Sequence, residues 1–196
     1  MSKQLFTIDV TNRILEIYED DILIKKIDNV WIGKNGYALE SDMVEGNEKT
    51  PLGFYNLGVA FGMHDLNISY PYFKIEDNDY WVDDSNSKHY NYMVRIGKEI
   101  EDFGYPYIIS LNEKDFTSAE HLITFKKQYE YAVFIEYNCF NQIENGIGNN
   151  KSSAIFLHCH GDKGYTGGCV AVSREDMKYI LNILDKNKNP QILIKK

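Results

Sequence analysis

The stretch from Phe156 to Ser173 reads Phe-Leu-His-Cys-His-Gly-Asp-Lys-Gly-Tyr-Thr-Gly-Gly-Cys-Val-Ala-Val-Ser. Apolar residues at both ends predict two buried strands, and the polar, glycine-rich middle predicts the loop that joins them. His158 falls at the end of the first strand and Cys169 at the start of the second, 11 residues further along the chain. One returning loop can close that separation, so the two side chains are expected to meet.

A cysteine nucleophile needs a base or a cation near its thiol and enough access to reach a substrate. His158 is the candidate base for Cys169. The pair Gly167-Gly168 allows a sharp turn before the cysteine and leaves backbone N–H groups to face a developing oxyanion. The pattern predicts a Cys/His acyl-transfer site. The alternatives are that Cys169 is a small buried apolar residue and that His158 is a hydrogen-bonded structural histidine.

A zinc site is the chief rival to this interpretation. His158 and His160 are two residues apart and so share one side of a strand, and Asp162 adds a carboxylate nearby. These are acceptable zinc ligands, and they would make the chain a zinc-dependent hydrolase. The other three histidines show no ligand spacing among themselves.

The remaining cysteines are predicted to be apolar core residues. Three cysteines cannot all pair with one another, so a disulfide scaffold is excluded. Cys159 faces away from His158 and His160 by strand alternation. We expect Cys159 and Cys139 to be buried, which leaves Cys169 as the candidate reactive thiol.

The composition of the chain limits the kinds of partner that can be expected. The chain has 196 residues, 21 Lys plus Arg and 29 Asp plus Glu, and a formal net charge of −8. Without a basic run, nucleic acid is not an expected partner. The sequence has no apolar stretch of about 18 residues, so no membrane span is predicted. Asp9 interrupts the segment where a signal peptide would need an apolar run, so no export signal is predicted, and the compartment and oligomeric state stay open.

Short β-rich runs dominate the rest of the chain. We expect strands at 5–10, 13–18, 22–27, 131–137, 153–157 and 191–194. Residues 45–62 are expected to form a long surface loop that feeds a strand, and the tyrosine-rich residues 70–110 to form loops packed over a sheet.

Helical spacing predicts one helix from Ser118 to Tyr129 and another that begins with the capping-box residues Ser173 and Asp176. The coarse prediction is one domain over residues 1–196, mainly β with peripheral helices.

The order of residues from Ser153 to His158 and from Tyr165 to Ala171 resembles the active-site motif of the L,D-transpeptidase catalytic-domain family. In that family a strand-end His is followed by a loop and a Ser/Thr-x-Gly-Cys turn. The resemblance covers roughly residues 30 to 194 and implies a β-sandwich-like fold. Its upstream landmarks are Glu45-Gly46, Lys49–Tyr55, Ala60–Gly62, Trp81–Asp84, Tyr90-Asn91, Tyr129–Tyr131 and Tyr137-Asn138.

The resemblance also implies roles for individual residues. Cys169 would attack a peptide carbonyl and form a thioester, and His158 would take the thiol proton and later serve the incoming amine or water. Thr166 occupies the Ser/Thr position of the motif, and the N–H groups of Gly168 and Cys169 would form the oxyanion hole. The implied substrate is the peptidoglycan stem peptide in the cell envelope, with no metal and no organic cofactor.

One departure from the family pattern concerns Gly167, which stands where many members have a second His. The supporting role of that second His is unfilled in this chain unless His160 reaches the site from the loop. The motif leaves open whether the acceptor is an amine, as in an L,D-transpeptidase, or water, as in an L,D-carboxypeptidase. A non-catalytic wall-binding module of the same fold is a third possibility.

Overall fold

The computed structural model describes residues 3–196. Met1 and Ser2, the first residues of the segment in which no export signal is predicted, lie outside the described residues. Its larger sheet runs in the order β15-β14-β11-β5-β16-β1-β2-β3, and β4 and β6 also pair with β5. These ten strands are β1 (Gln4–Asp9), β2 (Ile14–Glu19), β3 (Ile22–Ile27), β4 (Tyr37–Leu39), β5 (Thr50–Gly62), β6 (Tyr72–Lys74), β11 (Tyr131–Ile135), β14 (Phe156–Cys159), β15 (Val170–Val172) and β16 (Gln191–Lys195).

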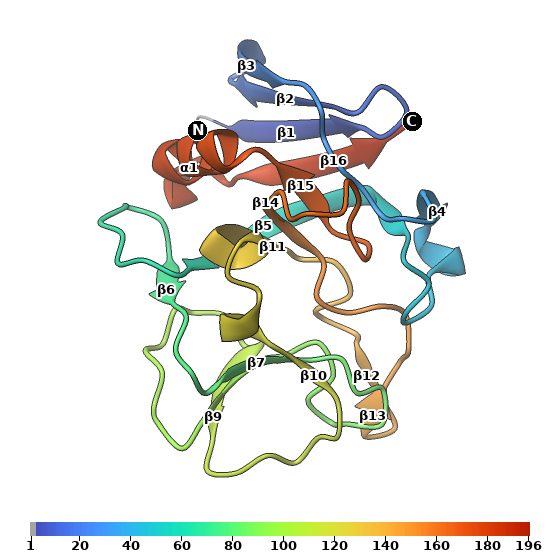
Figure 1. Cartoon of the computed structure of the whole chain (residues 1–196), viewed down its shortest axis with the longest axis vertical. Coiled ribbons are helices and arrows are strands. Elements are labelled where there is room, and N and C mark those ends of the chain that lie inside the picture. The colour runs from blue at the N-terminus through green and yellow to red at the C-terminus, as the bar shows by residue number, and fades with distance from the viewer. Residues whose placement is uncertain (1–2) are drawn as a thin grey trace.

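A second sheet lies at the other end of the molecule from β1, β2 and β3 (Figure 1). Its strand order is β10-β7-β8-β9, and a separate two-stranded ribbon joins β12 to β13. Their bounds are β7 (Asp79–Val82), β8 (Met93–Ile96), β9 (Ile108–Leu111), β10 (Ala119–His121), β12 (Ile143–Glu144) and β13 (Ile147–Gly148). The mainly β class is therefore confirmed, whereas the sandwich is not, because the ten strands belong to one curled sheet.

Two segments that were predicted to form loops contain strands. Residues 50–62 form the long strand β5, because Leu57 and Ala60 are buried in one core of the large sheet and Val59 and Phe61 in the other. Residues 70–110 contain β6 to β9, in which Trp81 is fully buried and pairs with Met93. Their aromatic side chains form core as well as surface.

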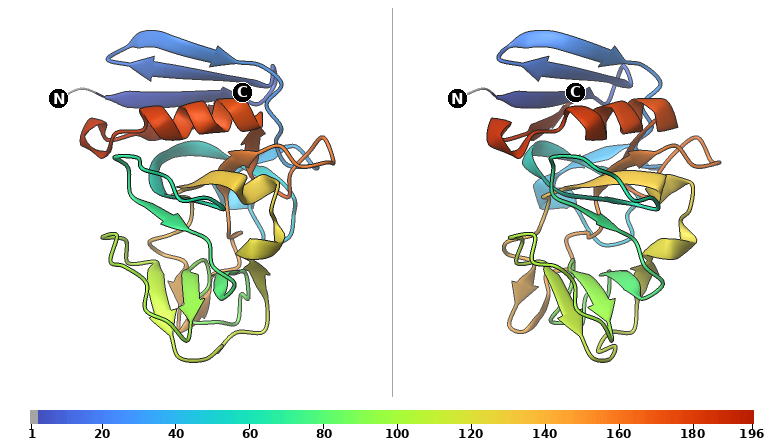
Figure 2. Two further views of the ribbon diagram at one scale, coloured as in Figure 1. Left: turned by 60° about the vertical axis from the view of Figure 1, so that its left-hand side comes forward. Right: turned by 90° about the vertical axis from the view of Figure 1, so that its left-hand side faces the viewer.

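The helix α1 (Arg174–Ile183) confirms the predicted C-terminal helix. The Asp176 N–H donates to the Ser173 hydroxyl at 3.1 Å, which caps the first turn. The buried side chains of Met177, Ile180 and Leu181 pack into the core beside the large sheet, along which α1 runs in Figure 2. No helix among residues 3–196 is long and apolar enough to cross a membrane.

The predicted helix from Ser118 to Tyr129 is wrong. Ala119–His121 form β10, which pairs antiparallel with β7, and the rest forms the 3-10 turns η2 (Leu122–Thr124) and η3 (Gln128–Glu130). Two further 3-10 turns are η1 (Glu40–Asp42) and η4 (Lys186–Lys188). Pairing with β7 outweighs the local helical spacing.

Strands β11 and β14 separate two apolar cores. Leu157 and Val133 belong to the core that α1 covers, whereas Phe156 and Phe134 belong to an aromatic core on the opposite face. Trp81 of the second sheet packs there, with its ring centroid 4.8 Å from that of Phe156. Strand alternation then places the side chain at 158 on the aromatic side.

Strand β16 joins two parts of the large sheet. It pairs antiparallel with β5 on one side and parallel with β1 on the other. Within residues 3–196, the strand pairing that links β1-β2-β3 to β5 therefore runs through residues 191–195.

Candidate active site

Strands β14 and β15 bring the predicted catalytic pair together. They lie parallel with His158 opposite Ala171, so Cys169 stands just before β15 and beside Phe156. The Phe156 N–H donates to Cys169 Sγ at 3.3 Å, and the thiol donates to the Ala154 carbonyl oxygen at 3.1 Å. The returning loop thus brings Cys169 back beside the strand that carries His158.

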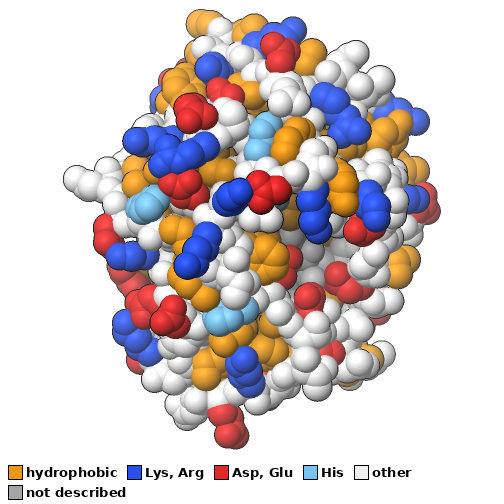
Figure 3. All heavy atoms as spheres, viewed as in Figure 1, with side chains coloured by type: hydrophobic (Ala, Val, Ile, Leu, Met, Phe, Trp, Pro, Cys, Tyr) orange, Lys and Arg blue, Asp and Glu red, His pale blue; other side chains and the backbone are white. Residues whose placement is uncertain are grey.

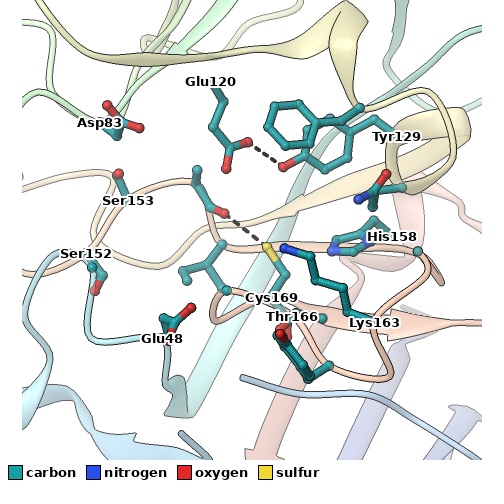
Figure 4. A pocket seen from close by; sticks show the side chains of 18 of the residues that line it. Glu48, Asp83, Glu120, Tyr129, Ser152, Ser153, His158, Lys163, Thr166 and Cys169 are labelled. Atoms are coloured by element: carbon teal, nitrogen blue, oxygen red, sulfur yellow. Dashed lines mark hydrogen bonds between the residues drawn. The ribbon is translucent and has the colours of Figure 1, made fainter. Parts of the chain in front are cut away.

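Cys169, His158 and Thr166 line one cavity of about 270 Å³. Figure 4 shows Cys169 and His158 in it together with Glu120 and Tyr129, whose ring lies beside that of His158. The face in Figure 3 is hollowed right of centre, and both acidic and basic side chains surround the hollow. The cavity offers the thiol access to a substrate, although only 7% of Cys169 is exposed.

Two threonines hold the turn that presents Cys169. Thr166 Oγ1 donates to the Cys169 carbonyl oxygen at 2.6 Å and accepts the Gly168 N–H at 3.1 Å. Thr50 Oγ1 donates to the Gly168 carbonyl oxygen at 2.7 Å and accepts the Gly33 N–H at 2.9 Å. Two N–H groups were predicted to form the oxyanion hole. That of Gly168 already donates to Thr166, which leaves that of Cys169 to donate to an oxyanion.

Gly168 is required by the backbone itself. Its φ is +142°, and a Cβ there would lie 2.9 Å from the Lys49 carbonyl oxygen. Gly167 differs, because a Cβ at that position would meet no atom within 4 Å. The position where many family members carry His is therefore open space.

His158 is held in one tautomer. Its Nδ1–H donates to the Cys159 carbonyl oxygen at 2.7 Å, because a carbonyl can only accept. The other ring nitrogen, Nε2, is therefore the acceptor of the neutral ring. Burial lowers the pKa of His158 to about 4. The imidazole is thus neutral at pH 7 and able to take a proton.

The Cys169 thiol is also neutral at rest. Burial, and secondarily the charge of Glu120, raise its pKa well above the usual value. Because the thiol does not ionise on its own near pH 7, nucleophilic attack requires a base in the cavity. Cys139 and Cys159 are buried as predicted, and burial raises the pKa of each thiol to about 12.

His160 does not join the cavity. Its ring stacks on Trp31 with centroids 4.0 Å apart and an interplanar angle of 11°, and burial lowers its pKa. Asp162 lines the cavity but forms an ion pair with Lys127 at 2.6 Å. Across residues 3–196, no three His, Cys, Asp or Glu side chains are grouped to hold a metal ion. The structure does not assemble the zinc ligands that the sequence offered as an alternative.

The sequence prediction missed the carboxyl groups that line the cavity. Glu45 accepts hydrogen bonds from Tyr90 and from the Ser153 hydroxyl, the latter at 2.8 Å, and burial raises its pKa. Asp83 also lines the cavity, and its Oδ1 is buried without a hydrogen-bond partner in the described chain. Glu45 and the Asp83-Asp84 pair did stand out as sequence landmarks.

Glu120 is another carboxyl group that lines the cavity. It accepts a hydrogen bond from the Tyr129 hydroxyl, and burial raises its pKa to about 7, with further upward contributions from Asp83 and Glu45. No local pattern marked Glu120 as a site residue, because its segment was predicted to be a helix.

Comparison with known proteins shows the family to which the chain belongs. Residues 3–193 match the L,D-transpeptidase catalytic domain. The chain belongs to the L,D-transpeptidase catalytic-domain family. That membership confirms the family that the sequence motif predicted.

Two solved structures illustrate how far the similarity to this L,D-transpeptidase domain extends. The helical cell shape determining protein of Campylobacter jejuni is 15% identical with a TM-score of 0.53, and the match covers 100% of this chain and 48% of that one. An L,D-transpeptidase from Mycobacterium smegmatis is 11% identical with a TM-score of 0.44, covering 100% and 59%. The chain thus spans about half the length of the solved relatives. Among curated proteins, no sequence matched the chain.

Proposed function

We propose that the chain is a cysteine acyl-transferase that acts on peptidoglycan stem peptides, as an L,D-transpeptidase or an L,D-carboxypeptidase. One observation carries the proposal: Cys169 and His158 line the same cavity, with His158 Nδ1–H fixed on the Cys159 carbonyl and Nε2 left as the acceptor. Family membership supplies the substrate class, and that substrate lies in the cell envelope. We extend the proposal to residues 1–196 as a single catalytic domain.

The acylation step follows from the protonation states. His158 Nε2 takes the thiol proton as Cys169 Sγ attacks the carbonyl carbon of the L-centre in a tetrapeptide stem. The Cys169 N–H faces the developing oxyanion, and the hydrogen bonds of Thr166 hold the turn in place. The C–N bond then breaks, the terminal D-amino acid leaves with the proton from His158, and a thioester remains.

Lys163 fits the recognition of the leaving group. It is the one Lys or Arg among the described residues that line the cavity, and Figure 4 shows its side chain reaching over Cys169. An ammonium group there matches the terminal carboxylate of the D-amino acid. The stem peptide would then be held by its charged end next to the thiol.

The test uses defined tetrapeptide muropeptides and the variants Cys169→Ala and Cys169→Ser. The parent protein is expected to gain the mass of the acyl group and to release a D-amino acid, whereas neither variant should do so while retaining the parent's circular dichroism spectrum. If a Cys169 variant trims or joins muropeptides at the parent rate, the proposal is wrong. Binding of peptidoglycan by the parent without any change in muropeptide mass would indicate a wall-binding module instead.

A further inference from the structure

A hydrogen-bonded pair, Glu120 and Tyr129, lines the same cavity as the catalytic residues, with Tyr129 beside His158 (Figure 4). The carboxyl group accepts from the phenol, and its charge is close enough to affect the pKa of Cys169. The proposed acylation step uses neither residue. The structure therefore holds a second group able to take a proton beside the site of the thioester.

The surrounding aromatic core fixes this pair. The Tyr129 ring packs edge-on against Phe156 at 5.4 Å and against His158 at 5.6 Å between centroids. Glu120 sits in β10, where it pairs with Trp81 of β7. Burial raises the pKa of Tyr129 far above its ordinary value, so the phenol remains a donor. Tyr129 can then hold the Glu120 carboxyl in one place.

Breakdown of the thioester by an amine requires two proton transfers. A primary amine arrives as an ammonium ion with a pKa of about 10, so it must lose one proton before it can attack and a second afterwards. His158 has one free acceptor nitrogen, Nε2, because Nδ1–H is bonded to the Cys159 carbonyl, so it can take only one of the two protons. Burial, Asp83 and Glu45 raise the pKa of Glu120 to about 7, and Tyr129 opposes this increase. Water needs only one transfer, which His158 can perform.

We propose that Glu120 is the catalytic base that removes the first proton from an incoming primary ammonium, and that Tyr129 positions it. The inference rests on the proposed function and adds the acceptor class. The Glu120 carboxylate takes one ammonium proton, and the amine nitrogen attacks the thioester carbonyl. Its second proton passes to His158, the C–S bond breaks, and the Cys169 thiolate takes that proton. Glu120 then releases its proton to solvent.

The experiment separates the two half-reactions. First, the protein is mixed with a tetrapeptide muropeptide whose side-chain amine is acetylated, and thioester formation is followed by intact-protein mass. Then a stem peptide with a free side-chain amine is added, and joined and hydrolysed products are measured. Glu120→Gln is expected to acylate within about 3-fold of the parent rate but to transfer to the amine about 100-fold more slowly, with hydrolysis unchanged.

Controls make the result specific to Glu120. Glu113→Gln removes an exposed carboxylate from the preceding loop and should behave as the parent. Glu120→Asp should recover part of the transfer rate. Tyr129→Phe removes the hydrogen bond that lowers the pKa of Glu120, so the acidic limb of the transfer rate should move to higher pH. That profile also reflects the neighbouring Asp83 and Glu45.

The possible outcomes distinguish the inference from the function on which it rests. If the parent forms no thioester, the proposed function fails. If the parent forms the thioester, and Glu120→Gln yields joined and hydrolysed products in the same ratio as the parent, then Glu120 is not the base that deprotonates the incoming amine. A folded Glu120→Gln variant that acylates as slowly as it transfers also overturns the inference, because the carboxyl would then act in the first half-reaction.

Discussion

The Nδ1–H group of His158 donates to the carbonyl oxygen of Cys159 at 2.7 Å, between adjacent residues of one strand. The acceptor belongs to the backbone and therefore cannot rotate away or titrate. In many Cys/His sites a separate side chain orients the imidazole. Here strand β14 does so itself, which accounts for the orientation of His158 although the second family His is replaced by Gly167.

His158→Ala is expected to reduce kcat/KM for thioester formation by about 100-fold or more, because the neutral thiol then has no base. His160→Ala should reduce it by less than about 5-fold, since His160 stacks on Trp31 outside the cavity; its main effect should be a loss of about 1 kcal/mol in the free energy of unfolding. Rates are measured with tetrapeptide muropeptides and stabilities by urea unfolding. Equal losses of activity would show that His158 is not the base.

His158 should make the protein less stable in acid. Its pKa falls from an ordinary 6.5 to about 4 in the folded chain, so below pH 6.5 the unfolded chain binds a proton that the folded chain does not. The free energy of unfolding should therefore fall by about 2 to 3 kcal/mol between about pH 7 and pH 4.5 on account of this residue. In His158→Gln that part of the decrease should be missing. Identical pH dependence in both proteins would contradict the buried neutral imidazole.

Gly168 and Gly167 form a matched pair of neighbours. Gly168→Ala places a Cβ 2.9 Å from the Lys49 carbonyl oxygen at a φ of +142°, so the free energy of unfolding should fall by about 1 to 3 kcal/mol. Gly167→Ala projects into open space and should change it by less than about 0.5 kcal/mol. Urea unfolding measures both. A tolerated Gly168→Ala would mean that the turn before Cys169 has another conformation.

Lys163→Met should raise KM for the tetrapeptide donor by about 10-fold and leave kcat nearly unchanged, because a charged hydrogen bond to the terminal carboxylate is lost. Lys151→Met changes an exposed lysine that does not line the cavity and serves as the control. With a C-terminally amidated stem peptide, parent and Lys163→Met should have the same KM. A difference that persists with the amide would assign Lys163 another role.

Much of the strand pattern was predictable from local sequence. The runs that became β1, β2, β3 and β16 alternate or concentrate β-branched residues, and Ser173 caps α1 as its side chain suggests. The segment from Ser118 to Tyr129 was not predictable in this way, because its apolar spacing also fits a strand and two short turns. Its pairing with β7, some 40 residues earlier in the chain, decides the outcome.

The candidate site also contains some residues that local sequence predicts and others that it does not. Cys169, His158 and Thr166 lie within one loop and its flanking strands, so their proximity follows from chain connectivity. Glu120 and Thr50 reach the site from distant segments, and only the pairing of strands places them there. Their contributions require tertiary contacts that no local pattern contains.

The place of β16 has a consequence for biosynthesis. Since the strand pairing within residues 3–196 links β1-β2-β3 to β5 through Gln191–Lys195, the large sheet cannot close while those residues are still inside the ribosome. The strands β1, β2 and β3 leave the ribosome before β16 does, so one edge of β1 is unpaired until β16 follows. Pairing between segments so far apart in the sequence predicts slow folding, and until β16 is in place the unpaired edge of β1 is open to pairing with another chain.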